Sequence, residues 1–191
     1  MNNRNNSNNN KGDIRRSIKR RLREMDPAER AEKSMVIQEK LLSSEAFRKS
    51  RVVMFYVPLP EEVDTREAIK RALEQGKRVA VPYITSREGL MVPAEIYSLE
   101  DLDKGPFGIY QPKTAMIRKV PLEEIDLVVV PAIAFDEKNR RLGRGKGYYD
   151  RFLSDKHCSG AATVGLAFDL QVLQTLPSDE HDIPVSSVIT A

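Results

Sequence analysis

The sequence predicts an α/β fold with three layers, α/β/α, in which a mainly parallel sheet lies between helices. Apolar, β-branched runs such as residues 127–130 (LVVV) have the composition of strands that are buried on both faces of a sheet. Stretches with helical periodicity alternate with these runs along the chain, and Gly or Pro residues separate the two kinds of segment. Together these observations predict a Rossmann-like arrangement.

The composition predicts one domain in residues 11–191, preceded by a disordered, Asn-rich tail in residues 1–10. The net charge of +3, from 31 basic and 28 acidic residues, gives no general indication of nucleic-acid binding. The only cysteine excludes an internal disulfide, and two histidines argue against a zinc site. No apolar run is long enough to span a membrane, and the N-terminus lacks the apolar segment of a signal peptide. We therefore expect a cytoplasmic monomer with no membrane partner.

The first quarter of the chain predicts two helices. Apolar residues recur every three or four positions after Lys11 on a strongly basic background. Asp26 and Pro27 then have the residue types of an N-cap and a first helical position, with Glu29 as the capping partner. This second helix is expected to end near residue 43 and to carry the apolar side chains of Met35, Val36, Leu41 and Leu42.

A βαβ unit follows. A buried strand at residues 51–57 leads into a loop at 58–64, and Thr65 is expected to cap a helix that Gly76 ends. Residues 77–84 form the next predicted strand, residues 90–97 another, and residues 99–120 are expected to be irregular.

The C-terminal half predicts three more strands, at residues 127–130, 163–168 and 188–190, with a short helix at 171–176. A helix is expected to begin near Gly147. The loops 58–64, 136–147 and 168–171 each follow a strand. Because ligands of parallel α/β sheets lie beyond the carboxyl ends of the strands, these loops should converge on one rim.

The segment Gly143-Arg144-Gly145-Lys146-Gly147 is the most informative stretch of the chain. Glycines allow a close backbone approach, and the two cations attract an anion, so a strand, this loop and a helix start suit a bound phosphate. The pattern is neither a GxxxxGK[ST] loop nor a GxGxxG dinucleotide fingerprint. A flexible, solvated basic turn is the alternative interpretation.

Other candidates have two interpretations each. Asp150 suits a Mg²⁺ ligand beside a phosphate or a salt bridge to a neighbouring Arg. The basic residues of the first helix either form a solvated face or include one or two that close over a nucleotide. Glu62 either binds a polar heterocycle or is simply exposed to solvent. Phe107 is a loop anchor or a stacking platform, and Asp182 is a second carboxylate or a turn residue.

Residues 139–150 (NRRLGRGKGYYD) closely resemble the signature of the 5-formyltetrahydrofolate cyclo-ligase family, also called methenyltetrahydrofolate synthetases. The resemblance runs from about Lys11 to the end of the chain. It includes the segments 62–65 (EVDT), 108–112 (GIYQP) and 166–168 (LAF), and the later Asp182. These other segments are individually weak matches, but they occur in the order that the family shows.

The resemblance implies an enzyme that uses ATP and Mg²⁺ to convert 5-formyltetrahydrofolate to 5,10-methenyltetrahydrofolate, releasing ADP and phosphate. The formyl oxygen would be phosphorylated to an iminium phosphate before the ring closes. This chemistry needs positioning and charge neutralisation more than a covalent nucleophile.

The resemblance also implies roles for individual residues. Catalysis is assigned to Arg144, Lys146 and Tyr148, and Mg²⁺ binding to Asp150 and Asp182. The folate contacts are Val57 (with Tyr56 as the alternative), Glu62, Phe107, Arg144, Gly145, Lys146, Gly147 and Tyr148. The ATP contacts are Lys11, Arg15, Arg141, Leu142, Gly143, Arg144, Gly145, Lys146, Gly147, Tyr148 and Tyr149.

Two competing hypotheses remain from the sequence. A nucleic-acid-binding module would use the basic N-terminal helix and the RGKGYY segment, and its binding would fall steeply with salt. The near-neutral net charge and the buried-sheet pattern argue against it. A second enzyme hypothesis keeps the fold but replaces the folate with another amide that ATP activates.

Overall fold

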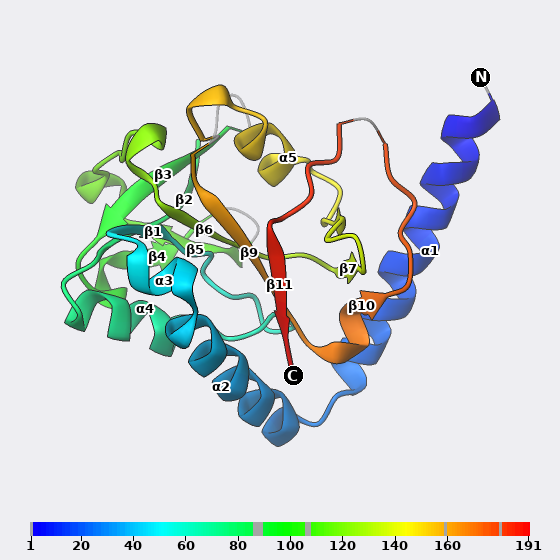
Figure 1. Cartoon of the computed structure of the whole chain (residues 1–191), viewed down its shortest axis with the longest axis horizontal. Coiled ribbons are helices and arrows are strands. Elements are labelled where there is room, and N and C mark those ends of the chain that lie inside the picture. Colours follow the sequence, from blue (N-terminus) through cyan, green and yellow to red (C-terminus); the bar gives the residue numbers. More distant parts are fainter. Residues whose placement is uncertain (1, 86–89, 106–107, 159, 180) are drawn as a thin grey trace.

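A six-stranded sheet forms the centre of the computed structural model, in the strand order β11-β9-β6-β1-β2-β3 (Figure 1). The structure describes residues 2–85, 90–105, 108–158, 160–179 and 181–191, and for residues 2–9 it describes the backbone only. All neighbouring strands of this sheet pair in parallel except β2 and β3. The predicted α/β fold with a mainly parallel sheet is confirmed. The strands are β1 (Val52–Met54), β2 (Arg78–Ile84), β3 (Met91–Ile96), β6 (Leu127–Val130), β9 (Ala162–Ala167) and β11 (Ser187–Thr190).

In the described ranges, five short strands lie outside this sheet. An antiparallel pair falls within the stretch that was expected to be irregular, and a three-stranded sheet of order β10-β7-β8 contains the hairpin that precedes the glycine-rich segment. The pair is β4 (Leu102–Lys104) and β5 (Tyr110–Pro112), and the three-stranded sheet is β7 (Ala134–Asp136), β8 (Arg141–Leu142) and β10 (Val172–Leu173).

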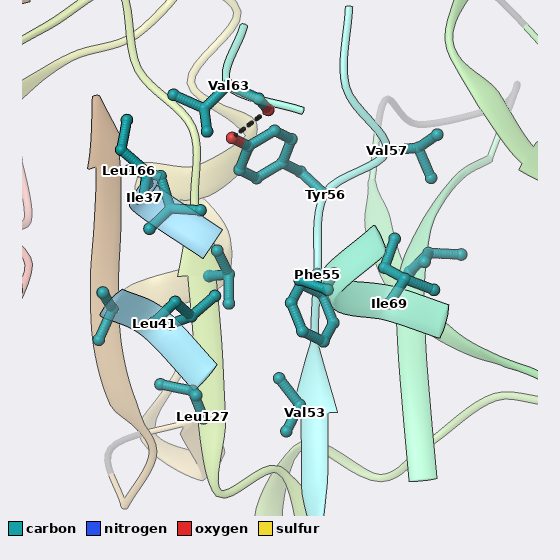
Figure 2. Close-up of a cluster of buried hydrophobic side chains, with 14 of the residues drawn as sticks. Ile37, Leu41, Val53, Phe55, Tyr56, Val57, Val63, Ile69, Leu127 and Leu166 are labelled. Atoms are coloured by element: carbon teal, nitrogen blue, oxygen red, sulfur yellow. Dashed lines mark hydrogen bonds between the residues drawn. The ribbon is translucent and has the colours of Figure 1, made fainter. Parts of the chain in front are cut away.

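Helices cover both faces of the central sheet. Successive strand residues point to opposite faces, so Val53 and Val129 pack with the first four helices, whereas Met54 and Val128 pack with Phe152 of the last helix. Figure 2 shows the first of these clusters, with Leu41 and Ile69 against the strand residues. The helices are α1 (Asn2–Glu24), α2 (Pro27–Ser43), α3 (Glu45–Lys49), α4 (Arg66–Glu74) and α5 (Tyr148–Leu153). Both clusters share one sheet, as a single domain requires.

The start of α2 has the predicted Asp26 cap, but the side chain of Glu29 is not its reciprocal partner and lies 3.8 Å from Lys33 Nζ instead. Pro27 is its first residue, and the carboxylate of Asp26 accepts hydrogen bonds from the backbone N–H groups of Ala28 and Glu29. The buried face of this helix differs from the predicted apolar set, because Met35 is 60% exposed. Val36 is also exposed, and the side chains that share the buried face at helical spacing are Ser34, Ile37, Gln38, Leu41 and Leu42.

Other segments also differ from the sequence-based expectations. The first strand ends at Met54 rather than Val57. Thr65 precedes α4 but its side chain makes no capping bond, because its hydroxyl donates to the carbonyl of Tyr56 at 2.8 Å. Residues 171–176 are not a helix: a 3₁₀ turn at Asp169–Gln171 leads into β10, because parallel pairing with β7 satisfies the backbone of this short segment. The backbone of residues 2–10 is helical and continuous with α1. Extending an established helix costs little per residue, since each added residue gains one hydrogen bond; disorder of this tail in solution stays a prediction.

None of the helices in the described part of the chain combines the length and the hydropathy that crossing a bilayer requires.

Packing between β9 and β7 generates a stability prediction. A Cβ atom added to Gly165 would lie 2.5 Å from the ring of Phe135, which is fully buried. We expect Gly165→Ala to lower the free energy of unfolding by about 1–3 kcal/mol, the usual cost of overpacking. Urea unfolding measures this loss. Gly160→Ala is the matched control, because nothing lies within 4 Å of its added Cβ; equal stability of the two variants would contradict the proposed clash.

Candidate active site

The β7–β8 hairpin is held by a buried carboxylate. The side chain of Asp136 is fully buried; its Oδ1 accepts from the backbone N–H groups of Lys138 and Arg140, each at 3.0 Å. Its Oδ2 accepts from Arg140 Nε at 2.7 Å and from the backbone N–H of Leu176 at 2.9 Å. Burial alone would raise the pKa of Asp136, but these bonds, led by those from the Arg140 side chain, hold it below its usual value. The carboxylate therefore stays ionised and fixes the hairpin.

Arg140 extends this connection to the C-terminal segment. Its guanidinium donates to Thr175 Oγ1 at 2.9 Å and to Ser178 Oγ at 3.1 Å. Asn139, at the left-handed φ of 58°, accepts a hydrogen bond from the backbone N–H of Val185. From the sequence, Arg140 was expected only to add positive charge beside the glycine-rich segment, and Asp136 had no predicted role. A carboxylate at a strand end, four residues before an Arg, was the available signal.

The glycine-rich segment leaves this hairpin after β8. Gly145 and Gly147 have φ values of 98° and 66°, a region that favours glycine, and Gly147 directly precedes α5 as predicted. Helix α5 has only six residues. Arg15 of α1 donates from Nε to the carbonyl oxygen of Gly143 at 2.9 Å. The basic N-terminal helix is therefore docked on this segment by one of the side chains that the sequence singled out.

A cavity lies beside the glycine-rich segment. One part of its wall is mainly apolar and comes from the segment that follows β1, from β2, β3 and the β6–β7 connection, and from Ile109. The other part comes from Glu62, from Arg141 of β8, from the glycine-rich segment and from α5. The apolar wall includes Tyr56, Val57, Leu59, Pro82, Ile84, Met91, Ile109, Pro131 and Ala132. The polar part includes Glu62, Arg141, Gly143, Arg144, Lys146, Gly147, Tyr148, Tyr149 and Asp150.

Most of the predicted site residues thus surround one cavity, and both Tyr56 and Val57 line it. Leu142 instead belongs to the hydrophobic core, at 2% exposure. Gly145, Lys11, Arg15 and Asp182 are not among the described lining residues. Phe107 lies outside the described residues. Sequence reasoning missed the apolar wall from β2 and β3, because those residues have the same types as ordinary core positions.

Glu62 and Arg144 form an ion pair between two of the predicted rim loops. Glu62 Oε1 accepts from Arg144 Nε at 3.1 Å and lies 3.0 Å from its Nη2, while Oε2 accepts from the backbone N–H of Leu59 at 3.0 Å. Glu62 is therefore not simply exposed: 11% of its side chain is accessible. The loops 58–64 and 136–147 converge as expected. The third loop, 168–171, has no described residue in the cavity wall, and its Gln171 donates to the carbonyls of Ala132 and Ile133.

Several buried polar atoms in the cavity wall have no hydrogen-bond partner among the described residues. They are Nε and Nη2 of Arg141, the hydroxyl of Tyr149 and Oδ1 of Asp150. Arg141 Nη1 lies 3.0 Å from Asp150 Oδ1, which is an ion pair but lacks hydrogen-bond geometry. Each such buried group costs about 1–3 kcal/mol when it is unsatisfied. This arrangement is typical of a site that receives a polar ligand.

Two tyrosines of the wall, Tyr56 and Tyr149, remain neutral. Burial, followed by the nearby Glu62 carboxylate, raises the pKa of both Tyr56 and Tyr149 far above the usual value. The hydroxyl of Tyr56 donates to the carbonyl of Val63 at 2.8 Å (Figure 2). The hydroxyl of Tyr149 keeps its proton and can donate it to a ligand oxygen.

The two predicted Mg²⁺ carboxylates lie in separate ion pairs, Asp182 with Lys11 and Asp150 with Arg141. Lys11 Nζ donates to Asp179 Oδ2 and Asp182 Oδ2, each at 2.7 Å. Burial would lower the pKa of Lys11, but these two carboxylates raise it overall, so the ammonium persists. Asp150 pairs with Arg141, as the salt-bridge interpretation predicted. Within the described residues, no group of three or more His, Cys, Asp or Glu side chains could hold a metal ion.

Comparisons with known proteins show the family and agree with this fold. Residues 7–191 match the model of the 5-formyltetrahydrofolate cyclo-ligase family. The chain is 32% identical over 186 residues to the 5-formyltetrahydrofolate cyclo-ligase of Mus musculus, covering 92% of this chain and 91% of that protein. It is 29% identical over 174 residues to the Escherichia coli K12 protein of the same name, covering 91% and 96%.

Solved structures give the same result. The NMR structure of a 5,10-methenyltetrahydrofolate synthetase from Aquifex aeolicus superposes with a TM-score of 0.81 at 33% identity, covering 94% of this chain and 89% of that one. The synthetase from Mycoplasma pneumoniae shares the fold, with a TM-score of 0.74 at 21% identity, covering 94% and 97%.

The fold, the cavity and these comparisons define an α/β enzyme of the ligase class. The chain belongs to the 5-formyltetrahydrofolate cyclo-ligase family.

The hairpin carboxylate generates a pH-dependent prediction. We expect Asp136→Asn to lower the free energy of unfolding at pH 7 by about 1–3 kcal/mol, because charged hydrogen bonds are lost. The folded pKa of Asp136 lies below the ordinary value of 3.8. The carboxylate's contribution is therefore complete above that pH and is lost as the pH falls through the folded pKa. Urea unfolding from pH 7 to pH 3 should show the gap between wild type and variant closing only below about pH 4.

The exposed Asp103 supplies the control. Asp103→Asn should leave stability almost unchanged over the same pH range. A wild-type advantage over Asp136→Asn that persists undiminished at pH 3 would refute the role given to the charge.

Proposed function

We propose that this enzyme converts 5-formyltetrahydrofolate to 5,10-methenyltetrahydrofolate with ATP and Mg²⁺, releasing ADP and phosphate. Several relatives are named for the first of these folates or for the second. In this chain, the observation that carries the proposal is the group of buried, unpartnered polar atoms of Arg141, Tyr149 and Asp150 beside an apolar wall. Polyphosphate oxygens would satisfy the donors, and a flat heterocycle would cover the apolar wall.

The nucleotide phosphates are assigned to the polar part of the cavity. Arg141 offers two unpartnered N–H groups and Tyr149 one hydroxyl, and the side chains of Arg144 and Lys146 add positive charge along the same wall. Arg15, bonded to the carbonyl of Gly143, would hold the segment in place from α1. Lys11 and the other predicted ATP contacts, including Leu142 and Gly145, stay predictions from the resemblance.

Asp150 fits a Mg²⁺ ligand, because its buried Oδ1 receives no hydrogen bond within the described residues. Asp182 fits less well, since its Oδ2 already accepts from Lys11 and from the backbone N–H of Asp179. When bound, Mg²⁺ would neutralise charge on the phosphate oxygens.

The pterin ring is assigned to the apolar wall, with Glu62 at its polar edge. A carboxylate that is only slightly exposed can accept two N–H bonds from such a ring. In the structure this carboxylate holds Arg144. Binding of the pterin would therefore compete with Arg144 for Glu62 and leave the guanidinium available to a phosphate.

The proposed reaction has two steps. The formyl oxygen attacks the γ-phosphorus of ATP, ADP leaves, and N5 carries an iminium phosphate. The nitrogen N10 then attacks the formyl carbon, loses its proton, and phosphate departs as the five-membered ring closes. Arg144 and Lys146 would stabilise the charge on the transferred phosphoryl group, and Tyr148 would orient the substrate between them. A cytoplasmic, monomeric enzyme stays a prediction from the sequence.

The direct test is an assay of the purified protein with 5-formyltetrahydrofolate, ATP and Mg²⁺, following the near-ultraviolet absorbance of the methenyl product. Omitting each component in turn should abolish product. Absence of product despite ATP binding would overturn the folate assignment and favour another ATP-activated amide.

Nucleic-acid binding that persists without Mg²⁺ and falls steeply with salt would favour the binding-module alternative. Two of the basic side chains that this alternative needs, Lys11 and Arg15, already form hydrogen bonds within the protein, which argues against it.

Charge stabilisation by the glycine-rich segment predicts large losses of turnover. Arg144→Ala and Lys146→Ala should each lower kcat by at least about a hundredfold, because a preorganised cation acts on charge that develops in the transition state. Steady-state kinetics at saturating ATP and folate measure the effect. Lys138→Ala, in the turn between β7 and β8, is the control. Near-normal turnover in both active-site variants would end this assignment.

Glu62→Gln separates folate binding from nucleotide binding. We expect the KM for 5-formyltetrahydrofolate to rise about 10- to 100-fold, the cost of one weakened charged hydrogen bond, while ATP affinity changes little. Calorimetric titration with a non-hydrolysable ATP analogue measures the latter. Glu61→Gln is the matched control, because Glu61 pairs mainly with Arg23 at 2.8 Å and lies 3.8 Å from Arg144. Equal losses of both affinities in Glu62→Gln would contradict the pterin contact.

A further inference from the structure

The side chain of Gln171 is a buried amide to which the proposed reaction gives no role. It is 2% exposed and lies at the end of the 3₁₀ turn Asp169–Gln171, between β9 and β10. Its Oε1 accepts from the backbone N–H of Phe168 at 2.8 Å, and its Nε2 donates to the carbonyls of Ala132 and Ile133 at 3.0 and 3.2 Å. Such an amide is a firm link, because breaking any of these bonds leaves a buried polar group unsatisfied.

The two carbonyls that Gln171 holds belong to the connection between β6 and β7. Pro131 and Ala132 of this connection line the apolar part of the cavity. The backbone N–H of Ile133 donates to the carbonyl of Leu142 at 2.8 Å, directly before the glycine-rich segment begins. Residues 131–133 lie outside the strands, so the Gln171 amide supplies the donors that a neighbouring strand would otherwise give to their carbonyls.

We propose that Gln171 is a positioning residue for the folate, because it holds Pro131 and Ala132 in the wall that would contact the pterin. This inference rests on the proposed function, which assigns the pterin to that wall. Gln171 is not among the described lining residues, so it acts through the backbone of residues 131–133 and not by touching the substrate. The rim loop 168–171 thus contributes to the site by supporting its wall.

The nucleotide part of the cavity is held by other contacts. Strand β8 pairs with β7, Arg15 donates to the carbonyl of Gly143, and the Asp136 carboxylate fixes the hairpin. Loss of the Gln171 amide should therefore displace the apolar wall more than the glycine-rich segment. A displaced wall weakens binding of the bound folate and of the transition state alike, which raises KM and leaves kcat nearly unchanged.

The test replaces Gln171 with a side chain of similar length that lacks the two N–H donors. Gln171→Met should raise the KM for 5-formyltetrahydrofolate about 3- to 10-fold and change kcat less than about twofold, because binding common to substrate and transition state is lost. The affinity for a non-hydrolysable ATP analogue, measured by calorimetry, should change less than about twofold, since its contacts are assigned to the other part of the wall.

Gln38→Met is the matched control for a merely structural role. Gln38 is 5% exposed, its Oε1 accepts from the backbone N–H of Ala68 at 2.8 Å, and it is not among the described lining residues of the cavity. Both variants lose a buried hydrogen bond and should unfold at lower urea concentration. Only Gln171→Met should change the KM for the folate.

Amide hydrogen exchange, followed by NMR, reports on the wall without any folate. Gln171→Met should speed exchange at Ile133 relative to the buried amide of Phe55, whose N–H donates to Ala80 in the central sheet. Gln38→Met should not raise this ratio, because its effect on the wall is only through global stability. If Gln171→Met does not fold, Gln171→Asn takes its place: its amide is one methylene shorter and cannot reach Phe168 and both carbonyls, so the same results are expected.

Three results would overturn the proposal. They are an unchanged KM in the folded Gln171 variant, an equal rise of KM in Gln38→Met, and an unchanged ratio of exchange rates at Ile133 and Phe55. Failure of the proposed function is seen separately, as wild-type protein without folate turnover. In that case the exchange ratio still decides whether Gln171 holds the wall.

Discussion

The buried carboxylate of Asp136 is the constraint on which the site depends. It joins the turn between β7 and β8, the side chain of Arg140 and the backbone of Leu176. Strand β8 contains Arg141, and the glycine-rich segment begins directly after it. The position of the phosphate-binding candidates is thus set by a hydrogen-bonded charge in the protein interior, where such bonds are strong and poorly replaced by water.

The charges of the site are balanced in pairs before any ligand is considered. Arg144 pairs with Glu62, Arg141 with Asp150, and Lys11 with Asp179 and Asp182. Pairing lowers the cost of holding several cations in a poorly exposed region. A ligand that binds here would therefore replace a carboxylate as the partner of a cation, and would not have to neutralise an unpaired charge. The proposed substrates suit such an exchange, because a phosphate can replace a carboxylate at a guanidinium.

Much of the architecture was predictable because it depends on local patterns. The alternation of apolar strands with helical stretches, the cap at Asp26 and Pro27, and the stop at Gly76 all follow from the preferences of neighbouring residues. Residues 171–176 were predicted wrongly, because pairing with β7 decides their conformation. The exposure of Met35 was likewise invisible, since an apolar residue type does not reveal which face of a helix meets the sheet.

The sequence by itself determined the family, through the order of glycine, basic and tyrosine residues in 139–150. It also predicted that the loops 58–64 and 136–147 should meet, which the cavity wall confirms, whereas loop 168–171 has no described residue there. Only the tertiary structure decided which side chains face one another. Glu62 and Arg144 are 82 positions apart and share a hydrogen bond, and Lys11 reaches across 171 positions to Asp182. Such contacts are set by how helices and loops pack on a common sheet, and the spacing of residues along the chain carries no direct record of that packing.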